Sequence, residues 1–139
     1  MKILLRNGRI ATATDDFIGD VYIDGEKIVA IGQDLPYSAD RVIDCTGKVV
    51  VPGGIDPHVH LDMPFMGTFS SDNYATGTLA ALHGGTTTVI DFILQKQGNS
   101  LRAALDEWRG RSDGNCYSDY SFHMPSPTSI RRRPSKCPR

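Results

Sequence analysis

Two histidines one residue apart, His58 and His60, are the residues of this chain whose type and spacing most directly suggest chemistry. They lie in the segment GGIDPHVHLDMP, residues 53–64, after the apolar run at 49–51. On a β-strand, residues i and i+2 point to the same face, so both imidazoles would face one side while Val59 packs on the other. Neutral imidazole binds zinc, manganese, cobalt and nickel, which makes the pair a candidate for half of a divalent metal site. Taken alone, such a pair is equally compatible with a polar strand end.

The elements around the pair predict a parallel α/β arrangement. VVVPGGIDPHVH is apolar with no polar face, as in a buried parallel strand. A helix is expected from residue 72, with Asp72 as its N-cap and Gly84-Gly85 as its stop. TTTVIDFIL predicts a strand, SLRAALDEWRGR a second helix capped by Ser100, and NCYSDYSFHM a third strand. The order strand, helix, strand, helix, strand is typical of a parallel α/β fold.

The chain on either side of this stretch has a different character. Residues 1–52 predict short strands joined by turns at Asn7-Gly8, Asp24-Gly25 and Thr46-Gly47, which indicate a small antiparallel sheet or half of a sandwich. Residues 125–139 contain four prolines and five basic residues and almost no large aliphatic side chains. Such a stretch cannot offset its chain entropy by burial, so we expect a disordered tail or a non-native ending produced by a shifted reading frame.

Composition excludes several classes of protein. The net charge is −1, which gives no electrostatic reason to expect nucleic acid or a membrane as a partner. Three cysteines without a C-x-x-C pair argue against a disulfide framework and against a cysteine-built zinc site. The apolar stretch at the amino terminus is too short for a signal peptide, and no run is long enough to span a membrane. A cytoplasmic location is the resulting expectation.

The residues around the histidine pair resemble the cyclic amidohydrolases. Residues 52–60 contain the pattern PG-x-ID-x-H-x-H of that superfamily. The continuation LDMPF-x-GT and the later GGTTTVIDF are most similar to dihydropyrimidinases and bacterial D-hydantoinases. The resemblance extends from residue 1 to about residue 124.

By this resemblance the chain is the start of an incomplete (β/α)₈ TIM barrel of the α/β class, preceded by part of a β-sandwich. Residues 1–52 would contribute to the sandwich, and residues 53–124 would form the first βαβαβ segment of the barrel. His58 and His60 match the two histidines on the first barrel strand that hold the more buried ion of a binuclear centre. Zinc is the expected ion, with manganese or cobalt as alternatives. Met63 and Phe65 match a loop that lines the substrate pocket, although a Met-Phe pair is also ordinary packing material.

The activity implied by the resemblance is hydrolysis of cyclic amides, such as dihydropyrimidines and hydantoins, to N-carbamoyl amino acids. The substrate would be a small cyclic ureide, and the family is typically homotetrameric. In the family a carboxylated lysine, two further histidines and the catalytic aspartate come from later barrel strands. We therefore expect no catalytic residue within this chain, and we expect the chain alone to be inactive.

Two alternatives remain for the function. One is a non-catalytic dihydropyrimidinase-like scaffold protein, which the presence of both His58 and His60 argues against. The other is a different cyclic amidohydrolase, such as an allantoinase or a dihydroorotase, which LDMPF-x-GT argues against.

Other polar residues near the pair have less defined roles. Asp62 could hydrogen-bond a ligand histidine, which would fix the orientation of the ring, or it could cap its loop. For Asp91, at the end of the second predicted strand, we favour a structural role or support of the metal ligands. His83 is expected at a helix end, Lys96 is expected in a loop without a ligand role, and His123 has no role that the resemblance assigns.

Overall fold

The computed structural model describes residues 1–125. The chain divides into two compact units, Met1–Pro52 and Gly53–Arg139, called here the first unit and the second unit. The disordered tail or shifted reading frame predicted for residues 125–139 lies, from residue 126 onward, outside the described residues.

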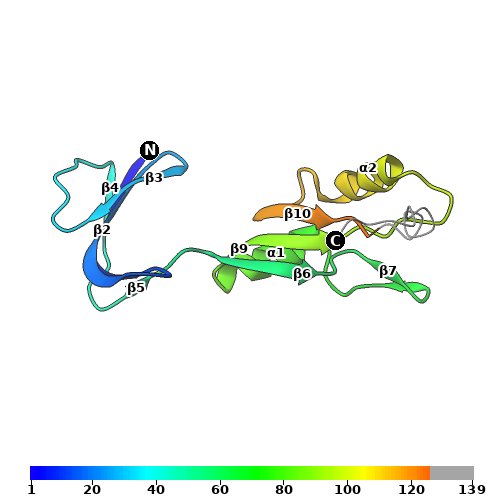
Figure 1. Ribbon diagram of the computed structural model, residues 1–139, viewed down its shortest axis with the longest axis horizontal. Coiled ribbons are helices and arrows are strands. Elements are labelled where there is room, and N and C mark those ends of the chain that lie inside the picture. The colour runs from blue at the N-terminus through cyan, green and yellow to red at the C-terminus, as the bar shows by residue number, and fades with distance from the viewer. Residues whose placement is uncertain (126–139) are drawn as a thin grey trace, which may run out of the picture. The chain divides into compact units, whose positions relative to one another are not determined.

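The first unit is a mixed five-stranded sheet (Figure 1). Strand β1 lies at its centre, pairs antiparallel with β2 and parallel with β4 and β5, and β3 pairs antiparallel with β2. The antiparallel sheet expected from the tight turns is therefore wrong for β4 and β5. These two strands follow one another along β1, both parallel to it, and they do not pair with each other around Thr46-Gly47. The strands are β1 (Lys2–Ala11), β2 (Asp16–Asp24), β3 (Lys27–Gly32), β4 (Arg41–Asp44) and β5 (Val49–Val50).

The predicted turn at Asn7-Gly8 is also wrong, because β1 runs through it as one strand. Asn7 adopts φ 60° there, and the pairing register with β2 shifts between Leu5 and Gly8. The residue forms a β-bulge in which the Asn7 N–H donates to the Asp20 carboxylate at 3.0 Å. Asp24-Gly25 does form the expected turn between β2 and β3, with Gly25 at φ 62°.

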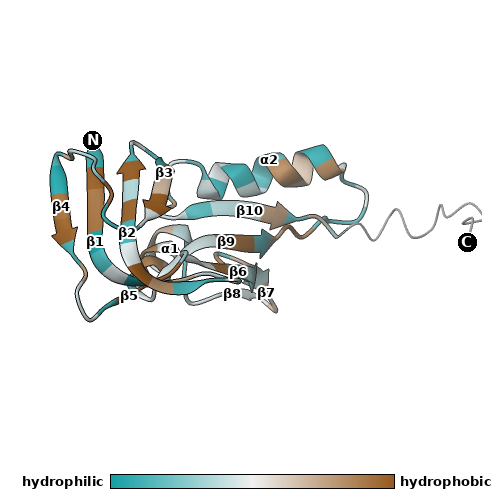
Figure 2. Cartoon of the chain, turned by 60° about the vertical axis from the view of Figure 1, so that its left-hand side comes forward, coloured by the Kyte–Doolittle hydropathy of each residue, from teal (hydrophilic) through white to brown (hydrophobic). Residues whose placement is uncertain are grey.

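Buried hydrophobic residues of β1 and β2 form the core of the first unit. Figure 2 shows hydrophobic residues on β3 and β4 as well, but most of these are exposed. Leu4 and Val21 are almost fully buried, and Tyr22 stacks on Tyr37 with ring centroids 4.5 Å apart. The buried Asp20 accepts hydrogen bonds from the backbone N–H groups of Asn7 and Leu35, which satisfies its carboxylate inside the unit.

The second unit contains a three-stranded parallel sheet in the order β10-β9-β6. A helix follows each of the first two strands, which is the strand–helix alternation that the sequence predicts. A two-stranded hairpin, β7 (Pro64–Phe65) and β8 (Thr68–Phe69), lies between β6 and the first helix. The larger elements are β6 (Gly54–Val59), α1 (Tyr74–His83), β9 (Thr86–Phe92), α2 (Leu101–Ser112) and β10 (Asp119–His123).

Both helices begin with a side-chain cap. The Ser100 side chain accepts from the Ala103 N–H, as predicted for α2. The cap of α1 is Asn73 rather than Asp72, because Asn73 and Thr76 form a reciprocal capping box. The helix α1 ends at His83, where the sequence places its stop. No helix among residues 1–125 is long and apolar enough to cross a membrane.

One face of the sheet packs against the helices to form the core of the second unit. Trp108 of α2 is 1% exposed and Tyr74 of α1 is 2% exposed, and both belong to one buried cluster with the sheet residue Val89. Gly53 makes a close approach to β9 possible, because a Cβ at this position would clash with the Thr87 side chain. The PGG sequence therefore lets β6 enter the sheet beside β9.

We expect Trp108→Ala to destabilise the second unit by about 3–5 kcal/mol, because it empties the largest fully buried side-chain site. Urea unfolding followed by far-UV circular dichroism measures this, since the variant removes the only tryptophan of the chain. Leu101→Ala, at a 41% exposed position of the same helix, is the matched control and should change stability by no more than about 0.5 kcal/mol. Equal losses in the two variants would contradict the assignment of the core.

Candidate metal centre and substrate pocket

A β-bulge in β6 determines which way the two histidines face. Asp56 pairs with Val89 and Val59 pairs with Asp91, so β6 uses three residues where β9 uses two. Without the bulge, residue 58 would pair with Asp91 and share the helix-packed face of the sheet. The extra residue instead turns Val59 toward the helices and leaves His58 and His60 exposed on the opposite face.

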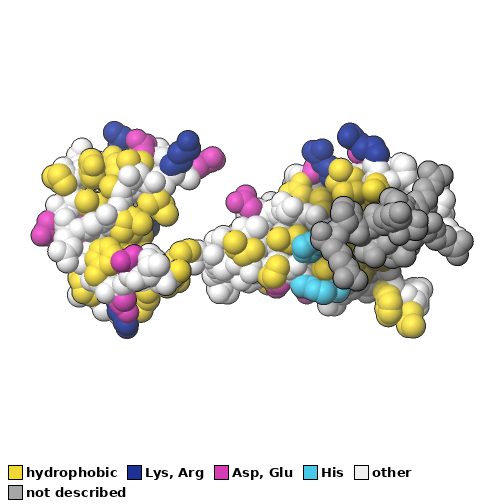
Figure 3. Space-filling view, in the orientation of Figure 1, with side chains coloured by type: hydrophobic (Ala, Val, Ile, Leu, Met, Phe, Trp, Pro, Cys, Tyr) yellow, Lys and Arg dark blue, Asp and Glu magenta, His cyan; other side chains and the backbone are white. Residues whose placement is uncertain are grey.

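The two imidazoles lie side by side around Phe92, the last residue of β9. The ring centroids of His58 and His60 are 5.1 Å apart at an interplanar angle of 88°. The Phe92 ring lies 4.4 Å from His58, 5.5 Å from His60 and 4.7 Å from His123, measured between centroids. Figure 3 shows histidine side chains together on this face, over the carboxyl ends of the parallel strands. Carboxyl ends of parallel strands are where functional groups of α/β proteins gather.

The spacing of the rings fits a shared metal ion. Two imidazoles bound to one ion at about 2.0–2.1 Å with a tetrahedral angle have ring centroids roughly 5 Å apart. The 5.1 Å separation of His58 and His60 therefore permits both to bind one ion. Among residues 1–125, no group of three or more His, Cys, Asp or Glu side chains is close enough to form a fuller site. The described residues thus supply a pair of imidazole nitrogen donors.

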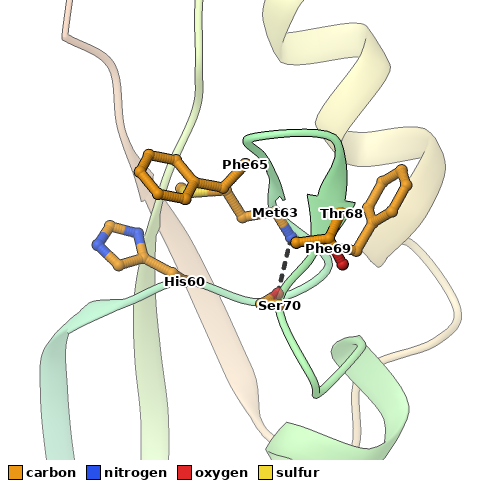
Figure 4. Close-up of a pocket in the computed structure, with 6 residues that line it drawn as sticks. All are labelled: His60, Met63, Phe65, Thr68, Phe69 and Ser70. Atoms are coloured by element: carbon orange, nitrogen blue, oxygen red, sulfur yellow. Dashed lines mark hydrogen bonds between the residues drawn. The ribbon is translucent and has the colours of Figure 1, made fainter.

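An apolar pocket of about 410 Å³ adjoins His60 (Figure 4). Met63 is 8% exposed and forms part of the wall, whereas Phe65 is 64% exposed on the hairpin. The structure thus brings His60, Met63 and Phe65, three of the sequence-predicted site residues, to one cavity. The lining residues are His60, Met63, Phe65, Thr68, Phe69 and Ser70.

The hairpin beside the pocket turns through two residues with positive φ. Met66 has φ 48° and Gly67 has φ 82°, which is the pattern of a type I′ turn. A methionine in the left-handed region is unusual, and its side chain is 90% exposed. The turn places Phe65 and Phe69 on neighbouring strands at the pocket, where they can contact an apolar group.

Asp91 lies on the opposite face of the sheet from the histidines and is fully buried. Its carboxylate accepts from the Tyr74 hydroxyl at 2.7 Å and from the Leu61 N–H at 3.3 Å. Burial raises the pKa of Asp91, while these hydrogen bonds, one from the Phe92 N–H and the charge of His60 oppose the shift. Burial and the Asp91 carboxylate raise the pKa of Tyr74. Asp91 therefore ties the residue after His60 to α1.

Asp62 is bound by an arginine of α2. The Arg111 guanidinium donates to the Asp62 carbonyl at 2.6 Å and lies 3.8 Å from its carboxylate. Within the described part of the chain, no hydrogen bond joins Asp62 to either histidine of the pair. The contacts of Asp62 are those of a residue that fixes its loop.

The other polar residues considered from the sequence lie away from the pair or support it indirectly. His83 is exposed at the end of α1, and Lys96 forms an ion pair with Glu107 at 3.3 Å. The His123 ring nitrogen Nε2 lies 2.9 Å from the Pro57 carbonyl oxygen, so this side chain contacts the strand that carries the pair. Sequence reasoning missed Tyr74 and Arg111. The only signal for Arg111 was its position three residues after Trp108, on the same helical face.

Tyr74→Phe should lower the free energy of unfolding of the second unit by about 1–3 kcal/mol, because a buried carboxylate loses a hydrogen-bond donor. The raised pKa means that folded Asp91 binds its proton more tightly than the ordinary value of 3.8 implies. Removing the hydroxyl raises that pKa further, so the destabilisation is small at pH below 3.8 and grows as pH rises through the folded-state pKa.

Urea unfolding followed by Trp108 fluorescence at several pH values measures the effect of Tyr74→Phe. Tyr117→Phe, at a 63% exposed position, is the control and should leave the curve unchanged. A loss of stability that did not depend on pH would show that the hydroxyl does not act through Asp91.

Comparisons with known proteins identify the family of the chain. The sequence model described as "Amidohydrolase family" matches residues 49–111. The D-hydantoinase of Geobacillus stearothermophilus is 49% identical over 124 residues, which cover 89% of this chain and 26% of that protein. The crystal structure of dihydropyrimidinase from Brevibacillus agri aligns with a TM-score of 0.88 and 50% identity, covering 94% of this chain and 29% of the other. A structure concerned with the binuclear metal centre of D-aminoacylase aligns with a TM-score of 0.52 and 33% identity, covering 64% of this chain and 18% of the other.

The chain spans about a quarter of the length of the curated relatives that it matches. Within that span the matches confirm the resemblance stated from the residues around His58 and His60. The chain belongs to the dihydropyrimidinase and D-hydantoinase group of the amidohydrolase family.

Proposed function

We propose that this chain forms part of a metal-dependent hydrolase that opens cyclic ureides, such as dihydropyrimidines and hydantoins, to N-carbamoyl amino acids. The observation that carries the proposal is the exposed pair His58 and His60, with ring centroids 5.1 Å apart beside an apolar pocket that His60 itself lines. The names of the relatives, D-hydantoinase and dihydropyrimidinase, support this reaction class.

In this proposal the β10-β9-β6 sheet is the beginning of a (β/α)₈ barrel, and the sheet of residues 1–52 is part of a β-sandwich. The parallel pairing, with a helix after β6 and after β9, supports the barrel. The exposed position of the pair supports it as well, because His58 lies in the bulge near the carboxyl end of its strand. Catalytic groups of such barrels gather at that end.

His58 and His60 would hold one divalent ion through their ring nitrogens. The amidohydrolase family is metal-dependent. We propose zinc first, with manganese or cobalt as alternatives, and two ions in a complete site. Such an ion supplies Lewis acidity, which makes water a stronger nucleophile near neutral pH and polarises a carbonyl oxygen.

The other residues of the site would bind and orient the ring. Met63 and Phe65 offer apolar contact area to a hydrocarbon substituent and exclude water from that side of the pocket. Asp91 and Asp62 would support the pair by fixing the chain immediately after His60. We assign no residue among 1–125 as the base that transfers the proton. In the proposal, the catalytic aspartate of later barrel strands has that role.

Two other functions are weaker candidates. A non-catalytic scaffold protein would have no need of paired imidazoles on an exposed sheet face. An allantoinase or dihydroorotase would share the metal pair and differ in its substrate pocket, so a substrate panel separates these enzymes. The homotetramer and the cytoplasmic location stay predictions.

A chimera tests the proposed function. The aligned 124 residues of the Geobacillus stearothermophilus D-hydantoinase are replaced by the matching residues of this chain, and ring opening of hydantoin is followed by release of the carbamoyl product. We expect activity in the chimera. His58→Ala and His60→Ala should each lower kcat/KM by at least about 100-fold and reduce the bound metal, because a ligand is lost.

The matched control for the chimera is His83→Ala, which removes an exposed histidine at a helix end. It should keep both activity and metal content. A chimera that folds and binds metal but retains activity after loss of either His58 or His60 would refute the assignment of the pair.

The 139-residue chain alone should not turn over dihydrouracil or hydantoin when zinc is added. The physical reason is the donor count, because a catalytic zinc usually has three protein ligands and the described residues bring two histidines together. The measurement is product formation by the purified chain against the intact D-hydantoinase. Comparable turnover would contradict the prediction.

A further inference from the structure

The segment directly after His60 is fixed at three consecutive amides. Each N–H donates to a different part of the second unit: to β9, to the residue before the α1 cap, and to the end of the hairpin. Backbone groups tied in three directions cannot shift together without breaking several hydrogen bonds. The bonds are Leu61 N–H to Asp91 Oδ2 at 3.3 Å, Asp62 N–H to the Asp72 carbonyl at 2.8 Å, and Met63 N–H to Ser70 Oγ at 2.9 Å.

Arg111 makes the fourth contact, from a helix 49 residues further along the chain. Its Nη1 lies 2.6 Å from the Asp62 carbonyl oxygen, against 3.8 Å from the Asp62 carboxylate. The shorter distance shows that the main contact of the guanidinium is with the backbone carbonyl of Asp62. The side-chain charge is secondary.

Arg111 is itself held in place. Its guanidinium lies over the Trp108 ring, 4.8 Å from the centroid, and its Nη2 donates to Glu107 at 2.9 Å. The side chain is 22% exposed, and Trp108 beneath it is fully buried. A planar guanidinium fixed by a stack and an ion pair keeps its remaining donor in one direction. Here that direction is the Asp62 carbonyl.

Asp62 needs such a contact because of its backbone conformation. It has φ 47°, in the left-handed region that costs free energy for every residue except glycine. The conformation turns the chain between His60 and Met63. Both of these residues line the same pocket, so the turn at Asp62 sets where the imidazole stands against the apolar wall (Figure 4).

We propose that Arg111 is a positioning residue for this pocket. By donating to the Asp62 carbonyl, it holds the turn that brings Met63 to the same pocket as His60. The role of the pocket in binding a cyclic ureide rests on the proposed function. The positioning itself does not, and it can be measured without metal or substrate.

The experiment compares Arg111→Leu with Arg109→Leu in the full 139-residue chain. Arg109 lies on the same helix, is exposed, and pairs only with Asp113 among the described residues, so its removal is a matched loss of charge. One readout is amide hydrogen exchange by NMR. The other is the methyl signal of methionine, because Met63 is buried and Met66, on the same hairpin, is exposed.

For Arg111→Leu we expect the Asp62 and Met63 amides to exchange about tenfold faster, with the β9 amides unchanged. The Met63 methyl signal should shift while the Met66 signal stays in place. Arg109→Leu should match the wild type in every respect. Unchanged exchange at Asp62 and Met63 in Arg111→Leu would overturn the proposal.

Two further variants separate positioning from charge and from folding. Asp62→Asn keeps the backbone carbonyl and tolerates positive φ, so its Asp62 and Met63 amides should exchange at the wild-type rates. If these amides exchanged as fast as in Arg111→Leu, the ion pair with the Asp62 carboxylate, and not the bond to the carbonyl, would hold the turn. Arg111→Lys keeps a donor and should give intermediate exchange. If Arg111→Leu unfolds the second unit, the comparison is made with Arg111→Lys instead. Wild-type amide exchange at Asp62 and Met63 in Arg111→Lys would then refute the role of the fixed guanidinium.

Discussion

A β-strand has two faces, and this constraint determines what the histidines of β6 can do. Val59 and Leu61 contribute to the packing against the helices, so their neighbours at 58 and 60 must point the other way. The bulge before Val59 sets this parity, since continuous pairing from Asp56 would place residue 58 opposite Asp91. The imidazoles are exposed because Val59 between them and Leu61 after them pack on the helical side.

The same alternation separates two kinds of chemistry. On the open face, the imidazoles of His58 and His60 lie against Phe92, and no hydrogen bond within residues 1–125 occupies their ring nitrogens. On the packed face, the buried Asp91 carboxylate accepts hydrogen bonds from the Tyr74 hydroxyl and from backbone N–H groups. A buried carboxylate without such partners would be costly. Asp91 thus connects β9, α1 and the residue after His60, and it makes the position of the pair depend on helix packing.

Sequence reasoning succeeded where the determinants are local. Helical periodicity, the Ser100 cap and the Gly84-Gly85 stop lie within a few residues of what they specify, and both helices form as expected. It failed where a distant partner decides. Asn7-Gly8 has the composition of a turn, but Asp20 on the neighbouring strand accepts the Asn7 N–H and keeps β1 continuous. The cap of α1 is a local exception: it is Asn73 rather than Asp72, because Asn73 forms a reciprocal capping box with Thr76.

The site shows the same division between local and distant determinants. The pair of His58 and His60 is readable from spacing, because a two-residue period is a property of any strand. The adjoining Met63 and Phe65 follow within five residues, and they reach the same pocket as His60. Arg111 and Tyr74 contact this loop from helices, and nothing in the local sequence marks those contacts. Such supporting residues can be identified only from the three-dimensional structure, because their partners are distant in the sequence.

Two imidazoles on one strand fix two directions around an ion and leave the others open. Both donors are neutral, so an ion bound there keeps its full charge and its Lewis acidity. The same neutrality limits affinity, because within residues 1–125 no third His, Cys, Asp or Glu side chain is grouped with the pair to offset the cost of removing the ion from water. Asp91 cannot do so, since its oxygens are occupied on the packed face. The geometry of His58 and His60 therefore calls for further ligands that approach from the open side of the sheet, and the proposed hydrolase requires them there.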